Sequence, residues 1–364
     1  MSSQPQATIN PEAAAKITNI LNQVAGHPGG ENFLRKAMAE LGYSLFYKVE
    51  TRQLPVLDKE ERLAGAQAGV ILDCETTGLV PGQDKITQLA MIKVLFDQKG
   101  IISFGERFDR LRDPGKPIPA EVTELTGITD EMVRGKAITD QEVADFIGDA
   151  RTCIAHKADF DRVMLEADFA SAGFDKLRWD CSLAQIDWKA RGIKGASLEM
   201  ITKHFGFDYD AHNALSDILA LGHVLSEPGR NGKPSLFEEM WTRGCDQTVQ
   251  IVAVNSSFHV KDQLKDRGYK FSMDGSESNG FPKTWHITIP GTEEKILEEA
   301  AFLASQIYSK DMALPLFRFG PENRYSARRP AQETLNTTEP SNLLEAICLR
   351  TTTDGEYVSQ MQLV

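Results

Sequence analysis

The most constraining feature of the chain is a short apolar run that ends in two carboxylates. From Val70 to Gly78 the sequence reads V-I-L-D-C-E-T-T-G, so a single residue separates Asp73 from Glu75 just before a glycine turn. Side chains alternate between the two faces of a β-strand, so both carboxylates project from one face and can converge on one cation. A divalent metal ion would offset their repulsion and lost hydration. The pattern therefore predicts a metal site at the end of a strand.

Two further carboxylates close short motifs downstream. H-K-A-D-F-D runs from His156 to Asp161, and H-N-A-L-S-D runs from His212 to Asp217. Each residue taken singly reads as a surface acid or a loop histidine. Three such motifs in this order are hard to obtain by chance, so we interpret them as parts of one site.

Together, D-x-E-T-T-G, H-x-A-x-F-D and H-N-A-x-x-D resemble the DEDDh branch of the 3′-to-5′ exonucleases, a group that includes ribonuclease T and the proofreading subunit of bacterial DNA polymerase III. The likeness covers about residues 66–228 and includes E-L-T-G-I-T-D-E-M, from Glu124 to Met132. It implies a ribonuclease H-like fold, in which a mixed sheet is flanked by helices. The implied metal ligands are Asp73, Glu75, Asp161 and Asp217, and the implied general base is His212.

The resemblance also implies contacts to the 3′ nucleotide from the turn after the first carboxylate pair. The residues concerned are Thr76, Thr77, Gly78 and Leu79, with the leucine acting as a wedge. An ordinary turn with hydroxyl caps is the alternative interpretation.

The second motif departs from the family pattern, because Lys157 stands where asparagine is usual. Its ammonium group either holds a backbone phosphate or points to solvent. His156 either touches substrate or packs as a structural residue, and Phe160 either stacks on a base or belongs to a helix core. These alternatives stay open at the level of sequence.

Phosphodiester hydrolysis explains why such residues would occur together. Two divalent cations about 4 Å apart stabilise charge on the attacking and leaving oxygens, and four carboxylates suffice to hold them. Mg²⁺ and Mn²⁺ prefer such hard oxygen ligands, and no Cys/His cluster suggests zinc. If His212 lies on the loop entering a helix and Asp217 lies in its first turns, the imidazole can accept a proton from the attacking water.

We therefore expect a 3′-to-5′ exonuclease that releases nucleoside 5′-monophosphates from single-stranded or frayed DNA in replication or repair. An exoribonuclease that trims RNA ends is the alternative within the enzyme class, because the discrimination of sugars rests on contacts to the 2′-OH. A non-catalytic nucleic-acid-binding subunit would be expected to lack a ligand or the histidine, and all five residues are present.

Charge and composition narrow the class further. The net charge of −12 argues against a broad basic face for duplex DNA, although an enzyme that grips a few terminal nucleotides needs none. We see no membrane or secretion signal, and five scattered cysteines fit a reducing cytoplasm.

The pattern along the chain predicts several units. We expect a helical segment at 1–64 (helices near 10–24 and 33–41), the exonuclease domain at 65–228, a linker at 229–246, a small α+β accessory domain at 247–329 and a flexible tail at 330–364. Within the first domain, strands are expected near 70–76, 86–96, 101–108, 152–155 and 179–182.

The accessory domain loosely resembles small modules that accompany bacterial nucleases. Its basic and aromatic residues either bind single strands or form a hairpin core with a solvated helix; these are Lys261, Lys265, Tyr269, Lys270, Phe271 and Trp285. Two apolar stretches, Pro234–Phe237 and Ala313–Phe317, faintly resemble peptides that bind the sliding clamp, so a clamp or DNA polymerase is a possible partner. Core strand or linker is the more common explanation of such stretches.

Overall fold

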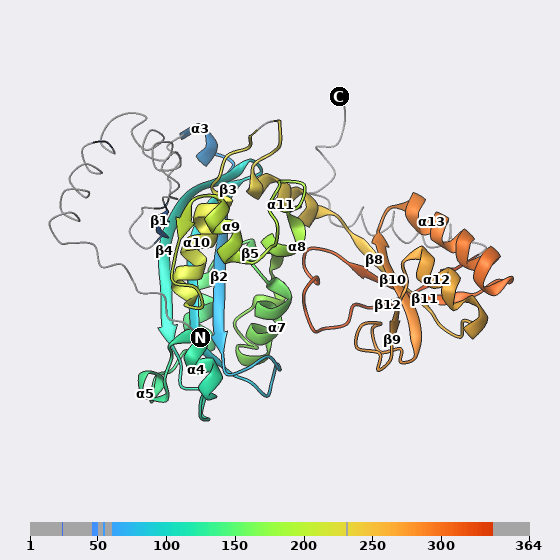
Figure 1. Cartoon of the computed structure of the whole chain (residues 1–364), viewed down its shortest axis with the longest axis horizontal. Coiled ribbons are helices and arrows are strands. Elements are labelled where there is room, and N and C mark those ends of the chain that lie inside the picture. Colours follow the sequence, from blue (N-terminus) through green and yellow to red (C-terminus); the bar gives the residue numbers. More distant parts are fainter. Residues whose placement is uncertain (1–23, 25–45, 50–53, 55–59, 231, 338–364) are drawn as a thin grey trace, which may run out of the picture.

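The computed structural model describes residues 24, 46–49, 54, 60–230 and 232–337. Two five-stranded sheets lie side by side along the long axis of the molecule, each with its own helices (Figure 1). Apart from Val24, which is helical, the helices predicted near 10–24 and 33–41 lie outside the described residues.

The first sheet is mixed, as predicted. It has the order β4-β3-β2-β5-β6; β4, β3 and β2 run antiparallel, whereas β2, β5 and β6 run parallel. The strands are β2 (Gln67–Thr76), β3 (Ile86–Asp97), β4 (Gly100–Leu111), β5 (Thr152–Ala155) and β6 (Arg178–Cys181). All five expected strands are present, which confirms the ribonuclease H-like layout.

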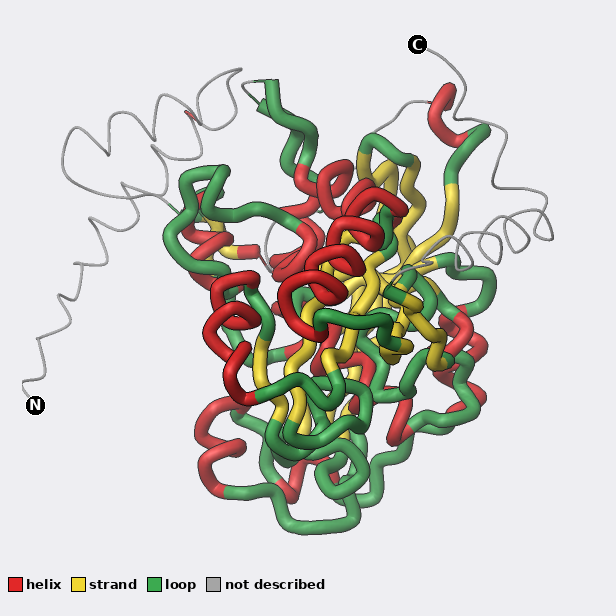
Figure 2. The backbone as a smooth tube through the Cα atoms, turned by 90° about the vertical axis from the view of Figure 1, so that its right-hand side faces the viewer, coloured by secondary structure: helices red, strands yellow, loops and turns green. Residues whose placement is uncertain are grey.

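Helices cover both faces of this sheet, and Figure 2 shows them around the strands in a perpendicular view. The elements are α3 (Glu60–Leu63), α4 (Ala120–Thr126), α5 (Asp130–Val133), α6 (Asp140–Ile147), α7 (Ala158–Asp168), η2 (Phe174–Lys176), α8 (Ser182–Gln185), α9 (Leu198–His204), α10 (Ala214–Leu225) and α11 (Leu236–Cys245). A two-residue strand, β1 (Tyr47–Lys48), pairs in parallel with β7 (Phe207–Asp208).

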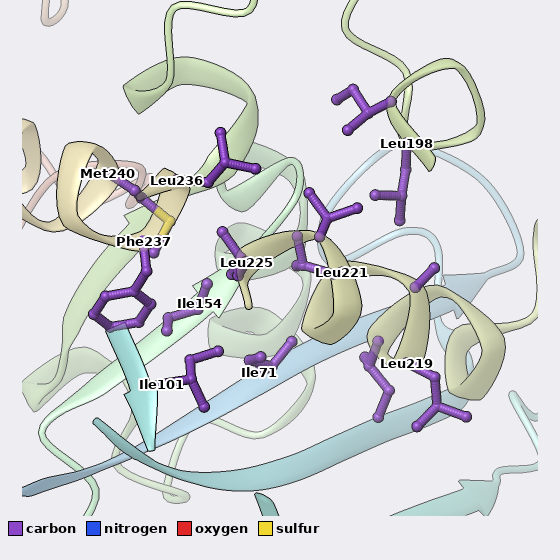
Figure 3. Packing of buried hydrophobic residues seen from close by; sticks show 14 of the residues in the cluster. Ile71, Ile101, Ile154, Leu198, Leu219, Leu221, Leu225, Leu236, Phe237 and Met240 are labelled. Atoms are coloured by element: carbon purple, nitrogen blue, oxygen red, sulfur yellow. The ribbon is translucent and has the colours of Figure 1, made fainter. Parts of the chain in front are cut away.

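Strand β2 is buried on both faces, and its alternation assigns the faces to separate cores. Ile71 packs with α9, α10 and α11, whereas Val70 and Leu72 pack with α6 and α7. Figure 3 shows the first of these cores, with Ile71 and Ile154 of the sheet beneath Leu221 and Leu225 of α10. The end of β2 is thus held between two helix layers, which fixes the direction of the side chains that follow.

The segment expected as a linker contains helix α11. Ser235 caps its N-terminus by accepting a hydrogen bond from the amide of Glu238. Phe237 and Trp241 pack against Phe96 of β3, with ring centroids 5.2 and 4.9 Å away. Because α11 fills the core of the first sheet, we propose that the exonuclease unit extends to Cys245.

The second sheet has the order β12-β11-β8-β10-β9. Its elements are β8 (Thr248–Ala253), η3 (Phe258–Val260), α12 (Lys261–Arg267), β9 (Lys270–Ser272), β10 (Thr284–Pro290), α13 (Glu293–Phe302), η4 (Leu303–Tyr308), β11 (Ala313–Phe319) and β12 (Gln332–Asn336). The prediction of a flexible tail from residue 330 is wrong for β12, which pairs antiparallel with β11 and buries Leu335. Its polar composition hid an edge strand that has only one buried side chain.

The two stretches proposed as clamp-binding peptides are folded into the protein. Phe237 is fully buried at the start of α11, and Leu314 and Leu316 are fully buried in β11. Their apolar side chains therefore contribute to cores and are not presented to a partner. Among the described helices, none combines the length and apolar character needed to cross a membrane.

Candidate active site

Asp73 and Glu75 lie at the end of β2 on the face that carries α10. The antiparallel pairing with β3 shifts register between Glu75 and Thr76, so the strand ends in an irregularity directly after the second carboxylate. Both side chains are half-buried. The strand thus delivers two acids to the rim of the sheet, beside the N-terminus of α10.

Helix α10 supplies the third carboxylate. Asn213 caps the helix by accepting a hydrogen bond from the amide of Ser216, which leaves Asp217 in the first turn. One ligand atom from each of Asp73, Glu75 and Asp217 lies within 4.8 Å of the other two. Residues separated by more than 140 positions in sequence therefore share one small volume.

His212 lies on the loop immediately before that helix. Its side chain is exposed, and its φ of 63° is in the left-handed region. The backbone amides of His212 and Asn213 hydrogen bond to the carboxylate of Asp217. The loop thus joins the exposed imidazole to the group of three carboxylates.

Asp161 approaches from the opposite face of the sheet. It lies in the first turn of α7, is only 2% exposed, and accepts hydrogen bonds from the backbone amide and the Sγ of Cys74, the latter at 3.5 Å. It is not part of the group within 4.8 Å, but its charge acts on both Asp73 and Glu75.

Burial raises the pKa of all four acids, and the neighbouring carboxylates add to the shift for Asp73 and Glu75. Burial, with smaller contributions from the neighbouring carboxylates, raises the pKa of Asp73 well above its usual range and that of Glu75 to about 7. Burial raises the pKa of Asp161 to about 7 and that of Asp217 to about 6, against hydrogen bonds that lower both.

These residues fit a divalent cation. The three carboxylates offer closely spaced oxygen donors without a basic side chain among them, and positive charge would relieve the repulsion that raises their pKa values. Asp161 could serve a second cation beside Asp73. Mg²⁺ and Mn²⁺ match this donor set.

The raised pKa values predict how pH and metal act on stability. Between about pH 4 and 7 the folded, metal-free protein keeps protons that the unfolded chain has lost. The free energy of unfolding is therefore highest, as far as these carboxylates contribute, below about pH 4, and it falls as the pH rises through 7. Cations require the deprotonated acids. We expect saturating Mn²⁺ to raise the melting temperature by about 5–10 °C at pH 8.

The same Mn²⁺ addition should raise the melting temperature far less at pH 5, which scanning fluorimetry against EDTA can measure. Glu75→Gln should remove most of the gain at pH 8. Equal gains at both pH values, or an undiminished gain in the variant, would show that Mn²⁺ binds elsewhere.

The turn after β2 presents one apolar side chain to solvent. Thr76 and Thr77 are buried, and Thr77 donates to Asp84 at 3.2 Å, so their hydroxyls serve the turn itself. Gly78 leaves no room for a side chain, because a Cβ there would lie 2.5 Å from the Asp84 carboxylate. Leu79, four residues after Glu75, is 76% exposed.

His156 is tied into the protein through both ring nitrogens. Nε2 lies 2.7 Å from the carbonyl of Ala196, and Nδ1 lies 2.8 Å from the hydroxyl of Ser182. A carbonyl only accepts, so Nε2 carries the hydrogen, and burial lowers the pKa of the ring. This arrangement favours the structural interpretation of His156.

Lys157 and Phe160 lie together at the start of α7. The Lys157 ammonium group is exposed and lies 5.7 Å from the centre of the Phe160 ring, which packs partly on the core beneath α7. The lysine is therefore placed at the edge of the helix, near Asp161, and remains available to an anionic ligand. A role for either residue in binding substrate stays a prediction.

Two neighbours of the carboxylates were missed at the level of sequence. Tyr209 donates a hydrogen bond to Asp217 at 3.0 Å, and burial raises the pKa of its hydroxyl. Gln88, opposite Glu75 in the sheet, accepts from the amide of Ala214 at the start of α10. Neither belongs to a motif, and only the position of Tyr209 eight residues before Asp217 could have drawn attention to it.

The six residues proposed to bind single strands differ in their exposure to solvent. Tyr269 is buried and donates to Glu299 at 2.8 Å, so it serves the core of the accessory domain. Phe271 is exposed on the edge strand β9 and contacts Trp285 across the pair, with ring centroids 5.3 Å apart. The three lysines lie at the surface, wholly or in part, and their role stays a prediction.

Part of the chain matches a known protein family. Residues 70–225 match the family model described as Exonuclease (RNase_T). This part of the chain is therefore similar to that exonuclease family. The match includes all four acids and His212, and it excludes α11 and the second sheet.

Curated relatives include PolC-type DNA polymerase III proteins. The one from Halalkalibacterium halodurans is 35% identical over 182 residues, and the one from Streptococcus suis is 32% identical over 225 residues. These alignments cover 47% and 58% of this chain but only 11% and 14% of the relatives. The chain thus matches a small part of much longer proteins.

Two nucleases that were solved in complex with DNA are among the structures similar to this chain. Exonuclease X in complex with 5′ overhanging duplex DNA is 22% identical, with a TM-score of 0.36 over 46% of this chain and 98% of the other. The zinc-bound E. coli ExoI–ssDNA complex is 15% identical, with a TM-score of 0.38 over 63% and 65% of the two chains.

Proposed function

We propose that this exonuclease-family chain is a metal-dependent 3′-to-5′ exonuclease that releases nucleoside 5′-monophosphates from single-stranded or frayed DNA ends. The observation that carries the proposal is the convergence of Asp73, Glu75 and Asp217 within 4.8 Å, next to an exposed His212 and with Asp161 close by. Within the exonuclease family this combination supports hydrolysis by a two-cation mechanism.

Each residue has a distinct part in this chemistry. Divalent cations held by the four carboxylates would supply positive charge to the attacking and leaving oxygens of the phosphodiester. His212, exposed and on a loop, accepts the proton of the attacking water. Tyr209 fixes the carboxylate of Asp217 through its hydrogen bond and so keeps that ligand in place.

DNA is the proposed substrate because the curated relatives named above are DNA polymerases and the chain matches a part of them. From the same comparison we also propose a role in proofreading or repair, a cytoplasmic location and a DNA polymerase as partner. The net charge of −12 favours a short grip on a strand end over tracking along duplex DNA.

The test is hydrolysis of oligonucleotides labelled at the 5′ end, as single-stranded DNA and as RNA of equal sequence, with Mg²⁺, Mn²⁺ or EDTA. We expect a ladder that shortens from the 3′ end on DNA, with mononucleotides carrying a 5′-phosphate, and no products in EDTA. Preferential degradation of RNA would replace the proposed substrate. Activity in EDTA or internal cleavage would refute the mechanism.

Leu79 offers a test of how the terminal nucleotide is held. A leucine that is 76% exposed in the turn after Glu75 would gain by covering a base, and burial of such a side chain is worth about 1.5–3 kcal/mol. We expect Leu79→Ala to raise KM for single-stranded DNA roughly tenfold and to change kcat less than threefold.

Leu63→Ala is the matched control, because Leu63 is an exposed leucine on α3. It should leave both kinetic constants unchanged. A wild-type KM in Leu79→Ala would exclude Leu79 from the binding site.

A further inference from the structure

A segment of the accessory domain lies against the helix that carries Asp161. We call residues 321–328, between β11 and β12, the strap. The carbonyl of Pro321 accepts from the amide of Trp179 at 3.0 Å, so the strap begins on β6, the edge strand of the first sheet. Tyr325 continues the contact by packing on the core beneath α7.

The strap is fastened to α7 through Arg162, the residue next to Asp161. The Arg162 side chain is 0% exposed; its Nη1 and Nη2 atoms donate to the carbonyls of Arg324 and Glu322, both at 2.6 Å. Its Nε donates to Glu166 one turn along the helix at 2.7 Å. A buried guanidinium needs partners for its N–H groups, and here the strap backbone provides two of them.

The start of α7 has no side-chain cap. Lys157 stands at the N-cap position and makes no side-chain capping bond. Ala158 is buried in the core, and the carbonyl of His156 just before the helix accepts from the amide of Leu183. Asp161 adds its hydrogen bond with Cys74 on one side of the first turn, and Arg162 adds its bonds with the strap on the other. A displacement of Arg162 would therefore move the adjacent carboxylate.

The strap has further anchors besides Arg162. Arg324 donates to the carbonyls of Gly244 and Asp246 at the end of α11, and Ser326 and Arg328 both bond to Glu166. These contacts tie the strap to both the helix and the end of the exonuclease unit. Loosening Arg324 would therefore loosen the carbonyls that hold Arg162.

We propose that Arg162 is a positioning residue and that the strap is a working part of the exonuclease: together they hold the first turn of α7 so that Asp161 stays in place for cation binding. The proposal rests on the function proposed above for the carboxylates. It makes the accessory domain a structural component of the active site, through segment 321–328.

The experiment uses the full chain with Arg162→Met, Arg324→Met and the control Arg318→Met. Arg318 lies in β11 and pairs with Glu333 at 2.9 Å, so its loss removes a partly buried ion pair of the same domain away from α7. Two measurements are made without nucleic acid: Mn²⁺ binding by electron paramagnetic resonance, and hydrogen exchange of the amides at 158–165. Hydrolysis of single-stranded DNA is the third.

We expect Arg162→Met and Arg324→Met to weaken Mn²⁺ binding, by about tenfold for Arg162→Met, and to speed exchange in the first turn of α7. Arg318→Met should lower the melting temperature without changing either. Arg324 is partly exposed, so Arg324→Met decides the question if Arg162→Met fails to fold. Wild-type Mn²⁺ affinity and wild-type exchange in a folded Arg324→Met would overturn the proposal.

Failure of the proposed function would look different. The wild-type protein would then bind Mn²⁺ without hydrolysing DNA, and the binding and exchange measurements would still test the strap. If the wild-type protein bound no Mn²⁺, unchanged exchange at 158–165 in both variants would still refute the positioning role.

Discussion

Asp73→Asn is expected to lower hydrolysis of single-stranded DNA by about a thousandfold or more, because Asp73 interacts with all three other acids that would hold the cations. Asparagine keeps the shape and removes the charge. Single-turnover rates with saturating Mn²⁺ would measure the loss without interference from product release.

The same substitution should make the metal-free protein more stable at pH 8. Burial and three neighbouring carboxylates raise the pKa of Asp73, so ionisation of that group costs stability as pH rises, and asparagine avoids the cost. Scanning fluorimetry in EDTA should therefore show a higher melting temperature for the inactive variant.

Asp145→Asn is the matched control, since Asp145 is an exposed aspartate on α6 of the same domain. It should keep wild-type activity and stability. An Asp73→Asn variant within tenfold of the wild-type rate would refute the assignment of this residue, whatever its melting temperature.

His212→Asn is expected to lower the rate of hydrolysis by about 10²–10⁴-fold and to leave Mn²⁺ binding unchanged, because the role proposed for His212 is to accept a proton and not to bind a cation. Asparagine is the sharper replacement because His212 has a φ of 63°, which asparagine tolerates better than alanine does. Loss of activity can then be read as loss of the base, without strain in the loop that also bonds to Asp217.

His204→Asn serves as its control: His204 is exposed in the last turn of α9, where its ring lies edge-on to Phe205 with centroids 5.2 Å apart. That variant should be as active as the wild type. If His212→Asn lost Mn²⁺ along with activity, His212 would have to be counted among the ligands.

The strands of the first sheet could be predicted because their local patterns and their burial agree. The strands β2 and β3 contain mostly apolar runs that end at turn residues, and the strand predicted near 152–155 coincides with β5 (Thr152–Ala155). Helix α11 was missed because the preceding E-P-G-R-N-G-K-P-S indicates a break, and only the packing of Phe237 and Trp241 on Phe96 shows that the domain continues past it.

The candidate site could likewise be predicted from the sequence only in part. The motifs pointed to Asp73, Glu75 and Asp217, and the structure brings these three together. Sequence could not show that Asp161 lies against Cys74, on the other face of the sheet, or that both nitrogens of His156 are engaged. Those facts depend on which distant segments meet, and no local pattern encodes them.

The core of the first sheet has a practical consequence for anyone who cuts this chain into pieces. Val49 and Leu54, before the family match, and Leu236 and Phe237, after it, are buried in the same core as Ile71. A fragment trimmed to residues 70–225 would keep every acid of the site, but it would expose the apolar core residues that the removed segments cover. The family match covers the catalytic residues, whereas the smallest fragment expected to be stable in solution extends beyond the match at both ends.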